Sequence, residues 1–324
     1  MANGRETARS EGFSEKMWLL PEKKRIFADM KGRFAPSPTG IMHLGNVFCA
    51  LLSWLSVKSR GGQWVLRIED LDPDRSRRHF ADRLMDDLEW LGLTWDEGPF
   101  FQSERHDRYA AALERLCAMG LVYPCFCTRA DIMATQAPHE SDGRIVYAGT
   151  CRTRPFTAED MERAALRLKV PDEEIAFTDG HYGRQCVNLA RHCGDFVIRR
   201  KDGAWAYQLA VVVDDAEMGI TEVVRGSDLL LSSPQQIYLA RLLGYPTPSF
   251  THLPLLCNAA GQRLSKRDKS LDMEALRAGH TAEEIVGRLA FLAGLTPDDA
   301  PCRAEELLPL FSWDKLPPER QIGV

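Results

Sequence analysis

The chain has 324 residues, of which 44% are hydrophobic, with a net charge of −5 at neutral pH and a pI near 6.0. This length allows one large domain with a subdomain, or two small domains, and the acidic balance argues against broad, nonspecific attraction to nucleic acid. No apolar run is long enough to cross a bilayer, so we expect no membrane partner and a cytoplasmic location. Without an export signal, the nine cysteines are expected to be reduced thiols or metal ligands.

The first part of the chain predicts alternating strands and helices. Residues 1–25 show no repeating pattern and are expected to be a loosely ordered extension. The pattern that follows predicts a strand at 26–34, a helix at 47–60 that ends before two glycines, and a strand at 64–69. This βαβ order places the loop before the helix at the carboxyl end of a parallel strand, where ligands bind in open sheets.

The rest of the chain divides around an insert. Residues 123–170 are predicted to be a loop-rich, cysteine-bearing insert between two halves of one catalytic domain, 26–122 and 171–270. Residues 271–324 are predicted to be a short helical segment, opened by a capping box at Thr281 and Glu284. The further elements predicted are helices at 75–91, 105–119, 233–243 and 281–292, and strands at 195–200 and 211–213.

Two segments far apart in the sequence have the character of a phosphate site. The loop from Pro36 to Asn46 runs into an apolar helical pattern, so the backbone N–H groups near Gly45 and the His43 imidazole would face a phosphate at the helix N-terminus. The basic loop Arg263-Leu264-Ser265-Lys266-Arg267 would bring a cation to the same phosphates. Together they predict a nucleotide-binding site.

These segments resemble the two signature sequences of class I aminoacyl-tRNA synthetases. Asn46 stands where many members have a second histidine, and Leu264 and Arg267 are departures in the second signature. The resemblance implies a Rossmann-type parallel-sheet α/β domain that uses ATP with Mg²⁺ to activate a carboxylate. It assigns catalysis to His43 and Lys266, and it assigns ATP binding to the same two residues together with Gly45 and Asn46.

Further matches resemble the glutamate site of glutamyl-tRNA synthetases. They imply that L-glutamate is bound by Arg33, Ser37, Glu69, Tyr207 and Arg225. Two guanidinium groups suit two carboxylates, one carboxylate suits the ammonium, and the phenol adds a hydroxyl. Taken singly, each residue has an ordinary explanation as a surface charge or core side chain, but their joint occurrence in family order favours a site.

The insert contains a possible metal site. Cys125, Cys127 and Cys151 are three thiols, whereas a structural zinc site has four ligands, so buried free cysteines remain the alternative. In a short paralogue of glutamyl-tRNA synthetase the pattern is Cys-x-Cys followed by Tyr-x-x-x-Cys, with the tyrosine oxygen as fourth ligand. The resemblance therefore implies one structural Zn²⁺ on these cysteines and Tyr147.

The end of the chain favours one branch of the family. About fifty residues follow Ser270, which we expect to be too few for an anticodon-binding domain of ordinary size. With the metal pattern, this resembles the glutamyl-queuosine tRNA(Asp) synthetases, which attach glutamate to queuosine in the anticodon loop of tRNA(Asp). A monomer is expected. The alternatives are a truncated glutamyl-tRNA synthetase that charges a tRNA 3′ end, and a catalytically silent, zinc-bearing RNA-binding protein.

Overall fold

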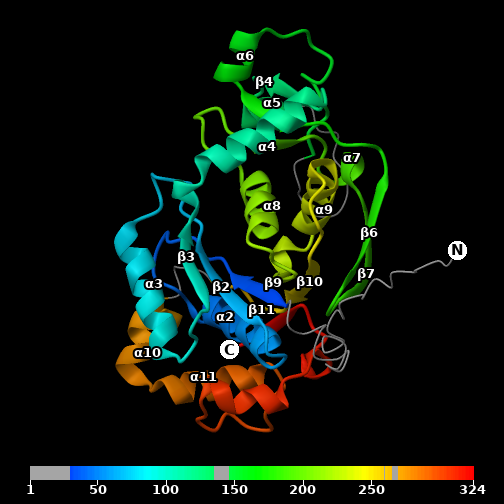
Figure 1. Cartoon of the computed structure of the whole chain (residues 1–324). Coiled ribbons are helices and arrows are strands. Elements are labelled where there is room, and N and C mark those ends of the chain that lie inside the picture. Colours follow the sequence, from blue (N-terminus) through cyan, green and yellow to red (C-terminus); the bar gives the residue numbers. More distant parts are fainter. Residues whose placement is uncertain (1–29, 135–145, 259, 265–268) are drawn as a thin grey trace, which may run out of the picture.

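A seven-stranded sheet in the order β3-β2-β1-β9-β10-β6-β7 organises the fold (Figure 1). The computed structural model describes residues 30–134, 146–258, 260–264 and 269–324. All neighbouring strands are parallel except the β6–β7 hairpin at one edge. The strands of this sheet are β1 (Lys31–Phe34), β2 (Gln63–Ile68), β3 (Glu97–Phe101), β6 (Glu174–Asp179), β7 (Gly183–Asn188), β9 (Glu222–Gly226) and β10 (Ser249–Leu253).

Helices cover both faces of this sheet and give the molecule two apolar cores. Along β2, Trp64 and Leu66 pack into one core while Val65 packs into the other, as the two-residue period of a strand requires. The first core contains side chains of α2 (Leu44–Lys58), α3 (Arg78–Trp90), α10 (Met273–Gly279) and α11 (Ala282–Leu292). The second contains side chains of α4 (His106–Ala118), α8 (Tyr207–Glu217) and α9 (Ser232–Leu243).

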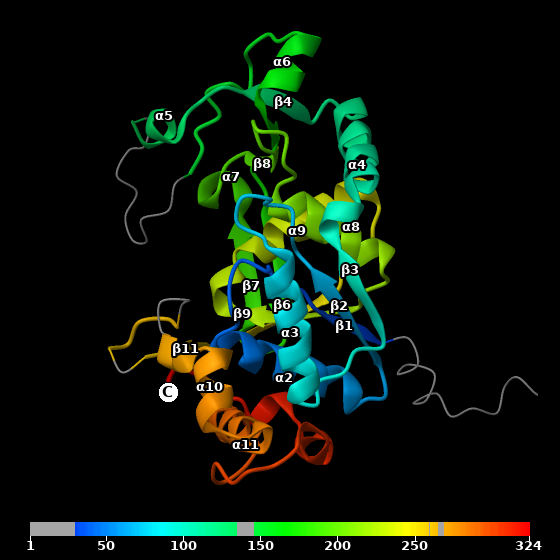
Figure 2. The same ribbon diagram turned by 90° about the vertical axis from the view of Figure 1, so that its left-hand side faces the viewer.

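A smaller antiparallel sheet lies at the opposite end of the molecule from α10 and α11 (Figures 1 and 2). Its strands, in spatial order, are β4 (Val122–Cys125), β5 (Ala165–Leu168) and β8 (Phe196–Arg199), and the short helices α5 (Arg129–Ala134), α6 (Ala158–Arg163) and α7 (Leu189–His192) accompany it. A parallel pair is formed by β11 (Leu255–Cys257) and β12 (Gln321–Gly323). The 3₁₀ turns are Gln102–Glu104, Ser227–Leu229, Lys269–Leu271, Ala304–Leu310 and Trp313–Lys315.

The mixed α/β class with a mainly parallel sheet is confirmed, and so are the helices predicted at 47–60, 105–119, 233–243 and 281–292. The helix predicted at 233–243 ends at Leu243 as expected, and Gly244 follows with a φ of 65°, the left-handed conformation that glycine adopts readily. The strand at 195–200 corresponds to β8, and the helix at 75–91 begins three residues late, at Arg78.

One predicted element is wrong. Residues 211–213 lie inside helix α8 rather than in a strand. All seven residues from Leu209 to Asp215 are buried, so this helix shows no exposed face and no 3.6-residue period, and its three valines have the preferences of a strand. The extension 1–25 and residues 26–29 of the first predicted strand lie outside the described residues. The small sheet also takes in β8, beyond the predicted end of the insert at 170.

Candidate active site and metal centre

A cavity of about 390 Å³ opens at the carboxyl ends of the adjacent strands β2, β1 and β9. All five residues predicted to bind glutamate line it, and so do His43, Gly45 and Asn46 of the predicted ATP site. Arg263 and Leu264, at the start of the second signature, also line it. Lys266 lies outside the described residues. The predicted glutamate and ATP residues in the described part of the chain therefore line one cavity.

His43 and Asn46 cap helix α2. The His43 Nδ1 accepts the Gly45 N–H at 3.1 Å, and the Asn46 Oδ1 accepts the His43 N–H at 3.0 Å. The reciprocal pair satisfies two N–H groups that a helix N-terminus otherwise leaves unpaired. Because Nδ1 is an acceptor here, a neutral His43 carries its proton on Nε2, and any contact with a phosphate would have to come from that nitrogen.

Arg33 and Arg67 share one buried carboxylate. The Asp215 Oδ1 accepts from Arg33 Nε at 3.2 Å and from Arg67 Nη1 at 2.6 Å. Arg67 also donates through Nη2 to Glu69 Oε1 at 3.2 Å. Burial raises the pKa of Asp215, but the two guanidinium groups outweigh it and hold the pKa below its usual value. This network fixes Arg33 and Glu69 on two neighbouring strands at the cavity wall.

Arg225 differs from the other two arginines because its partners are neutral. It is 6% exposed and donates to Gln236 Oε1 at 2.8 Å, Ser233 Oγ at 2.8 Å and His252 Nε2 at 3.1 Å. Its contacts with the Tyr207 hydroxyl, at 3.3 Å, and with the Leu229 carbonyl, at 3.5 Å, are longer. Among the described residues, no carboxylate lies within 4.0 Å of this guanidinium. Burial lowers the pKa of Arg225, as expected for a cation removed from water.

Sequence reasoning missed the residues that hold these groups in place. Arg67 and Asp215 are separated by 148 residues in the chain, and His252 lies 27 residues beyond Arg225. The only local signal was a polar residue inside an apolar strand or helix, as at Arg67, His252 and Asp215, since buried polar groups need partners. That signal identifies a buried residue but not its partner.

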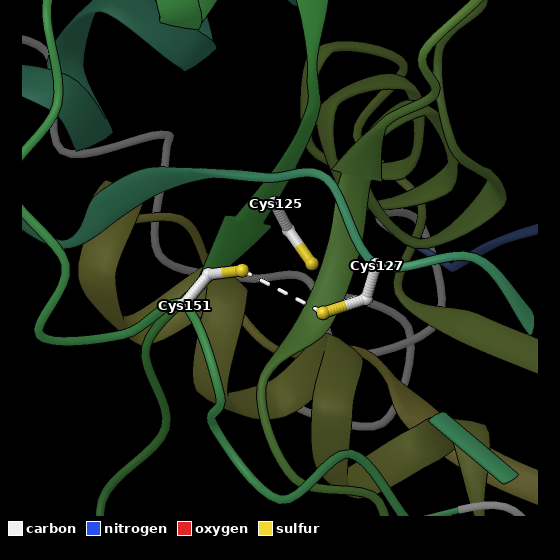
Figure 3. A group of neighbouring side chains, drawn as sticks. All are labelled: Cys125, Cys127 and Cys151. Atoms are coloured by element: carbon white, nitrogen blue, oxygen red, sulfur yellow. Dashed lines mark hydrogen bonds between the residues drawn. The ribbon is translucent and has the colours of Figure 1, made fainter. Parts of the chain in front are cut away.

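The three cysteines predicted as metal ligands come together at the end of β4. The Sγ atoms of Cys125, Cys127 and Cys151 all lie within 4.8 Å of one another, and their side chains converge (Figure 3). The Tyr147 hydroxyl is 3.3 Å from Cys125 Sγ and 3.9 Å from Cys127 Sγ, and it accepts the Cys151 N–H at 2.8 Å. All four predicted ligands therefore occupy one cluster.

One sulfur–sulfur separation and two sulfur–oxygen separations in this cluster lie near those of a tetrahedral zinc site. A regular tetrahedron with Zn–S bonds of about 2.3 Å places two sulfurs about 3.8 Å apart, and a shorter Zn–O bond gives an S–O separation of about 3.5 Å. The observed Cys127–Cys151 separation is 3.6 Å, and the two oxygen distances bracket the second value. Arg167 lies over the Tyr147 ring, 3.8 Å from its centroid, and holds it in place. The donor set can hold a metal ion.

Comparison with known proteins identifies the family. Residues 29–315 match the family of class I tRNA synthetases (E and Q), catalytic domain. A glutamyl-Q tRNA(Asp) synthetase of Symbiobacterium thermophilum is 50% identical over 305 residues, which cover 89% of this chain and 94% of that relative. This chain belongs to the glutamyl-Q tRNA(Asp) synthetase family. A family member from Nitratidesulfovibrio vulgaris is 47% identical with the same coverage.

Solved structures of glutamate-specific ligases share the fold. The glutamate tRNA ligase of Elizabethkingia meningosepticum, solved with its amino acid, has a TM-score of 0.76 and 29% identity, over 90% of this chain and 66% of that one. For the enzyme of Elizabethkingia anophelis the TM-score is 0.78 at 29% identity, with coverages of 91% and 68%. This chain thus spans about two thirds of their length.

Family membership makes this chain a ligase of the class I synthetase type, and such enzymes use ATP and Mg²⁺. Of the helices in the described part of the chain, none combines the length and the apolar character needed to cross a membrane. Family membership alone does not assign a role to each residue of the cavity, because more charged and polar side chains line the cavity than are needed to bind one amino acid.

Proposed function

We propose that this enzyme converts L-glutamate and ATP to glutamyl-adenylate and transfers the glutamate to the queuosine base in the anticodon of tRNA(Asp). The observation that carries the choice of amino acid is Arg225. It is a buried cation at the cavity wall, and its side-chain partners are all neutral. A buried charge is stable only when paired, so the site favours a ligand that brings a carboxylate.

The remaining groups suit the other charges of glutamate. Arg33 supplies a second guanidinium for a second carboxylate, and Glu69 supplies an anion for the ammonium, with Ser37 and Tyr207 adding hydroxyls at the cavity wall. Burial raises the pKa of Glu69 above its usual value, and the charges of Arg67 and Arg33 offset this only in part. A substrate ammonium beside Glu69 would stabilise the carboxylate form further, so binding of the substrate completes this charge network.

ATP is assigned to the N-terminus of α2 and the second signature. In the reaction, an α-carboxylate oxygen of glutamate attacks the α-phosphorus of ATP, and the bond to pyrophosphate breaks. His43 would donate from Nε2 to a phosphate oxygen near Gly45 and Asn46, and Lys266 would stabilise the charge that develops on the pyrophosphate. Mg²⁺ would bind together with ATP and neutralise part of the negative charge of its phosphates. No covalent nucleophile on the protein is required.

The metal centre is assigned one structural Zn²⁺ on Cys125, Cys127, Tyr147 and Cys151. A set of four protein ligands leaves no open position, which is typical of structural rather than catalytic zinc. Here it would tie the end of β4 to residues 147–151 and so hold the small sheet region together. Metal analysis of protein purified without chelator is the direct test.

The acceptor is assigned from the relatives, whose name specifies glutamyl-Q tRNA(Asp) and of whose length this chain covers 94%. An exposed base in a single-stranded loop is also what proteins recognise best in RNA. The partner we propose is the anticodon loop of tRNA(Asp) carrying queuosine, and we place the enzyme in the cytoplasm as a monomer.

The test is transfer of labelled glutamate to tRNA(Asp) prepared with and without queuosine, in the presence of ATP and Mg²⁺, followed by nuclease mapping. Label on the anticodon base, only when queuosine is present, is the expected result. Label on the 3′-terminal adenosine would make this a charging enzyme instead. Absence of label on either RNA would contradict the proposal and favour a silent RNA-binding protein.

A further inference from the structure

Arg225 is held from behind by a chain of buried polar side chains. Its Nε donates to His252 Nε2 at 3.1 Å, and His252 Nδ1 lies 2.6 Å from Asp179 Oδ2. His252 is 0% exposed and Asp179 is 2% exposed. They lie on β10 and at the end of β6, the two strands that follow β9 in the sheet. Neither is among the described residues that line the cavity.

The geometry fixes the protonation of His252. A guanidinium N–H only donates, so the Nε2 of His252 must accept, and the ring proton is on Nδ1, where it is donated to Asp179. Backbone N–H groups of His181, Tyr182 and His252 in turn hold the Asp179 Oδ1 at 2.9 to 3.3 Å. Burial, and then the charge of Arg225, lower the pKa of His252, while Asp179 raises it, and the net direction is down. His252 is therefore neutral at pH 7.

The contacts of Arg225 fall into two groups. The three shorter ones go to Gln236, Ser233 and His252, which belong to the scaffold and not to the cavity wall. The two longer ones, at 3.3 and 3.5 Å, go to Tyr207 and Leu229, which do line the cavity. The scaffold thus fixes the guanidinium, and the weakly held N–H groups on the cavity side are those that a ligand carboxylate can take over.

We propose that His252, oriented by Asp179, is a positioning residue for Arg225 that fixes the guanidinium through a neutral acceptor and so reserves its positive charge for a substrate carboxylate. The inference rests on the proposed function, in which Arg225 binds glutamate. A carboxylate in the place of His252 would orient Arg225 equally well, but it would neutralise the charge and compete with the substrate. An imidazole accepts the hydrogen bond without doing so.

The experiment compares His252→Leu with His252→Gln by glutamate-dependent ATP–pyrophosphate exchange. Leucine removes the acceptor, whereas the glutamine carbonyl replaces it. In His252→Leu we expect the KM for glutamate to rise about tenfold or more, the usual effect of losing a hydrogen bond to a charged group. The KM for ATP should stay within about twofold, because only the glutamate end of the site is disturbed. His252→Gln should recover most of the loss.

Thr251→Val is the matched control. Thr251 is the preceding residue on the same strand and is 4% exposed, and its side chain lies against Gly180 on the opposite face of the sheet from that of His252. It should leave both KM values unchanged. If His252→Leu fails to fold, Asp179→Asn is measured in its place, since it frees the His252 tautomer and should also raise the KM for glutamate.

Three results would overturn the inference. The first is an unchanged KM for glutamate in the folded variant, the second is an equal rise in both KM values, and the third is a glutamine variant no better than the leucine variant. Each of these results would show that His252 is a core residue only. In all three cases exchange by the wild-type enzyme still supports glutamate activation. Absence of glutamate-dependent exchange by the wild-type enzyme is a different result, which would refute the proposed function and this inference with it.

Discussion

Removal of Asp215 tests whether the buried network between β1, β2 and α8 stabilises the fold. In Asp215→Ala, Arg33 loses its only ion pair among the described residues, while Arg67 keeps Glu69 at 3.2 Å and Asp214 at 3.8 Å. Breaking a buried ion pair by removing one partner costs about 3 to 5 kcal/mol. Because Arg67 stays paired, we expect the lower end, about 3 kcal/mol. At roughly 2 °C for each kcal/mol in a chain of this size, Tm falls by about 6 °C.

The assay is denaturant unfolding at pH 7 together with thermal unfolding. Asp82→Ala is the control, because its ion pair with Arg78 joins side chains that are 56% and 67% exposed, and it should cost no more than about 0.5 kcal/mol. Asp215→Asn keeps the shape and one acceptor but loses the charge, so its free energy of unfolding should lie between those of Asp215→Ala and the wild type. If Asp215→Ala were no more destabilising than Asp82→Ala, the network would contribute nothing, and the reasoning from burial would be refuted.

Four further predictions concern the site. Lys266→Ala should slow ATP–pyrophosphate exchange by roughly a hundredfold or more, the usual effect of losing one electrostatic contact in a transition state, and a wild-type rate would remove its catalytic role. Tyr147→Phe should lose zinc to a chelator faster than the wild-type protein, measured by atomic absorption, and equal retention would show that the phenol is no ligand. Glu69→Gln should raise the KM for glutamate about tenfold or more without changing that for ATP, because it removes the partner of the ammonium. In the unfolded chain His252 is protonated below about pH 6.5, whereas the native state holds it neutral, so its contribution to stability is complete above that pH and falls as the pH decreases. Denaturant unfolding at pH 7.5 and 5.5 should therefore show a smaller loss of stability between the two pH values in His252→Gln than in the wild type.

The elements that the sequence predicted correctly are those with a local signal. Helix α11 has a capping box at its start, and α9 has a glycine at its end. Strand β3 was missed because it contains Gly98 and Pro99, which usually mark turns. It forms an edge of the sheet, where proline is tolerated in a strand. Helix α8 was mistaken in part for a strand because it is buried on all sides.

The residues of the candidate site also fall into those with a local sequence signal and those without one. His43, Gly45 and Asn46 lie together at the start of α2, and their joint place at a helix N-terminus follows from a stretch of a few residues. Two of the partners of Arg225, Gln236 and His252, lie on different elements, and no pattern along the chain shows that these side chains meet. Local motifs therefore predicted residues that line the cavity, whereas the residues that hold them in place could be identified only from the tertiary structure.

The arrangement around Arg225 bears on the choice between glutamate and glutamine, the two amino acids of the wider family. Arg33 is already paired with Asp215, so its hydrogen bonds to a ligand are compatible with either amino acid. Arg225 has no carboxylate partner among the described residues. If Arg225 holds the side-chain carboxylate of the substrate, glutamine would leave that cation buried and uncompensated, which is far more costly than a lost neutral hydrogen bond. In the proposed site, a neutral scaffold behind one arginine is thus sufficient to select a side-chain carboxylate over its amide.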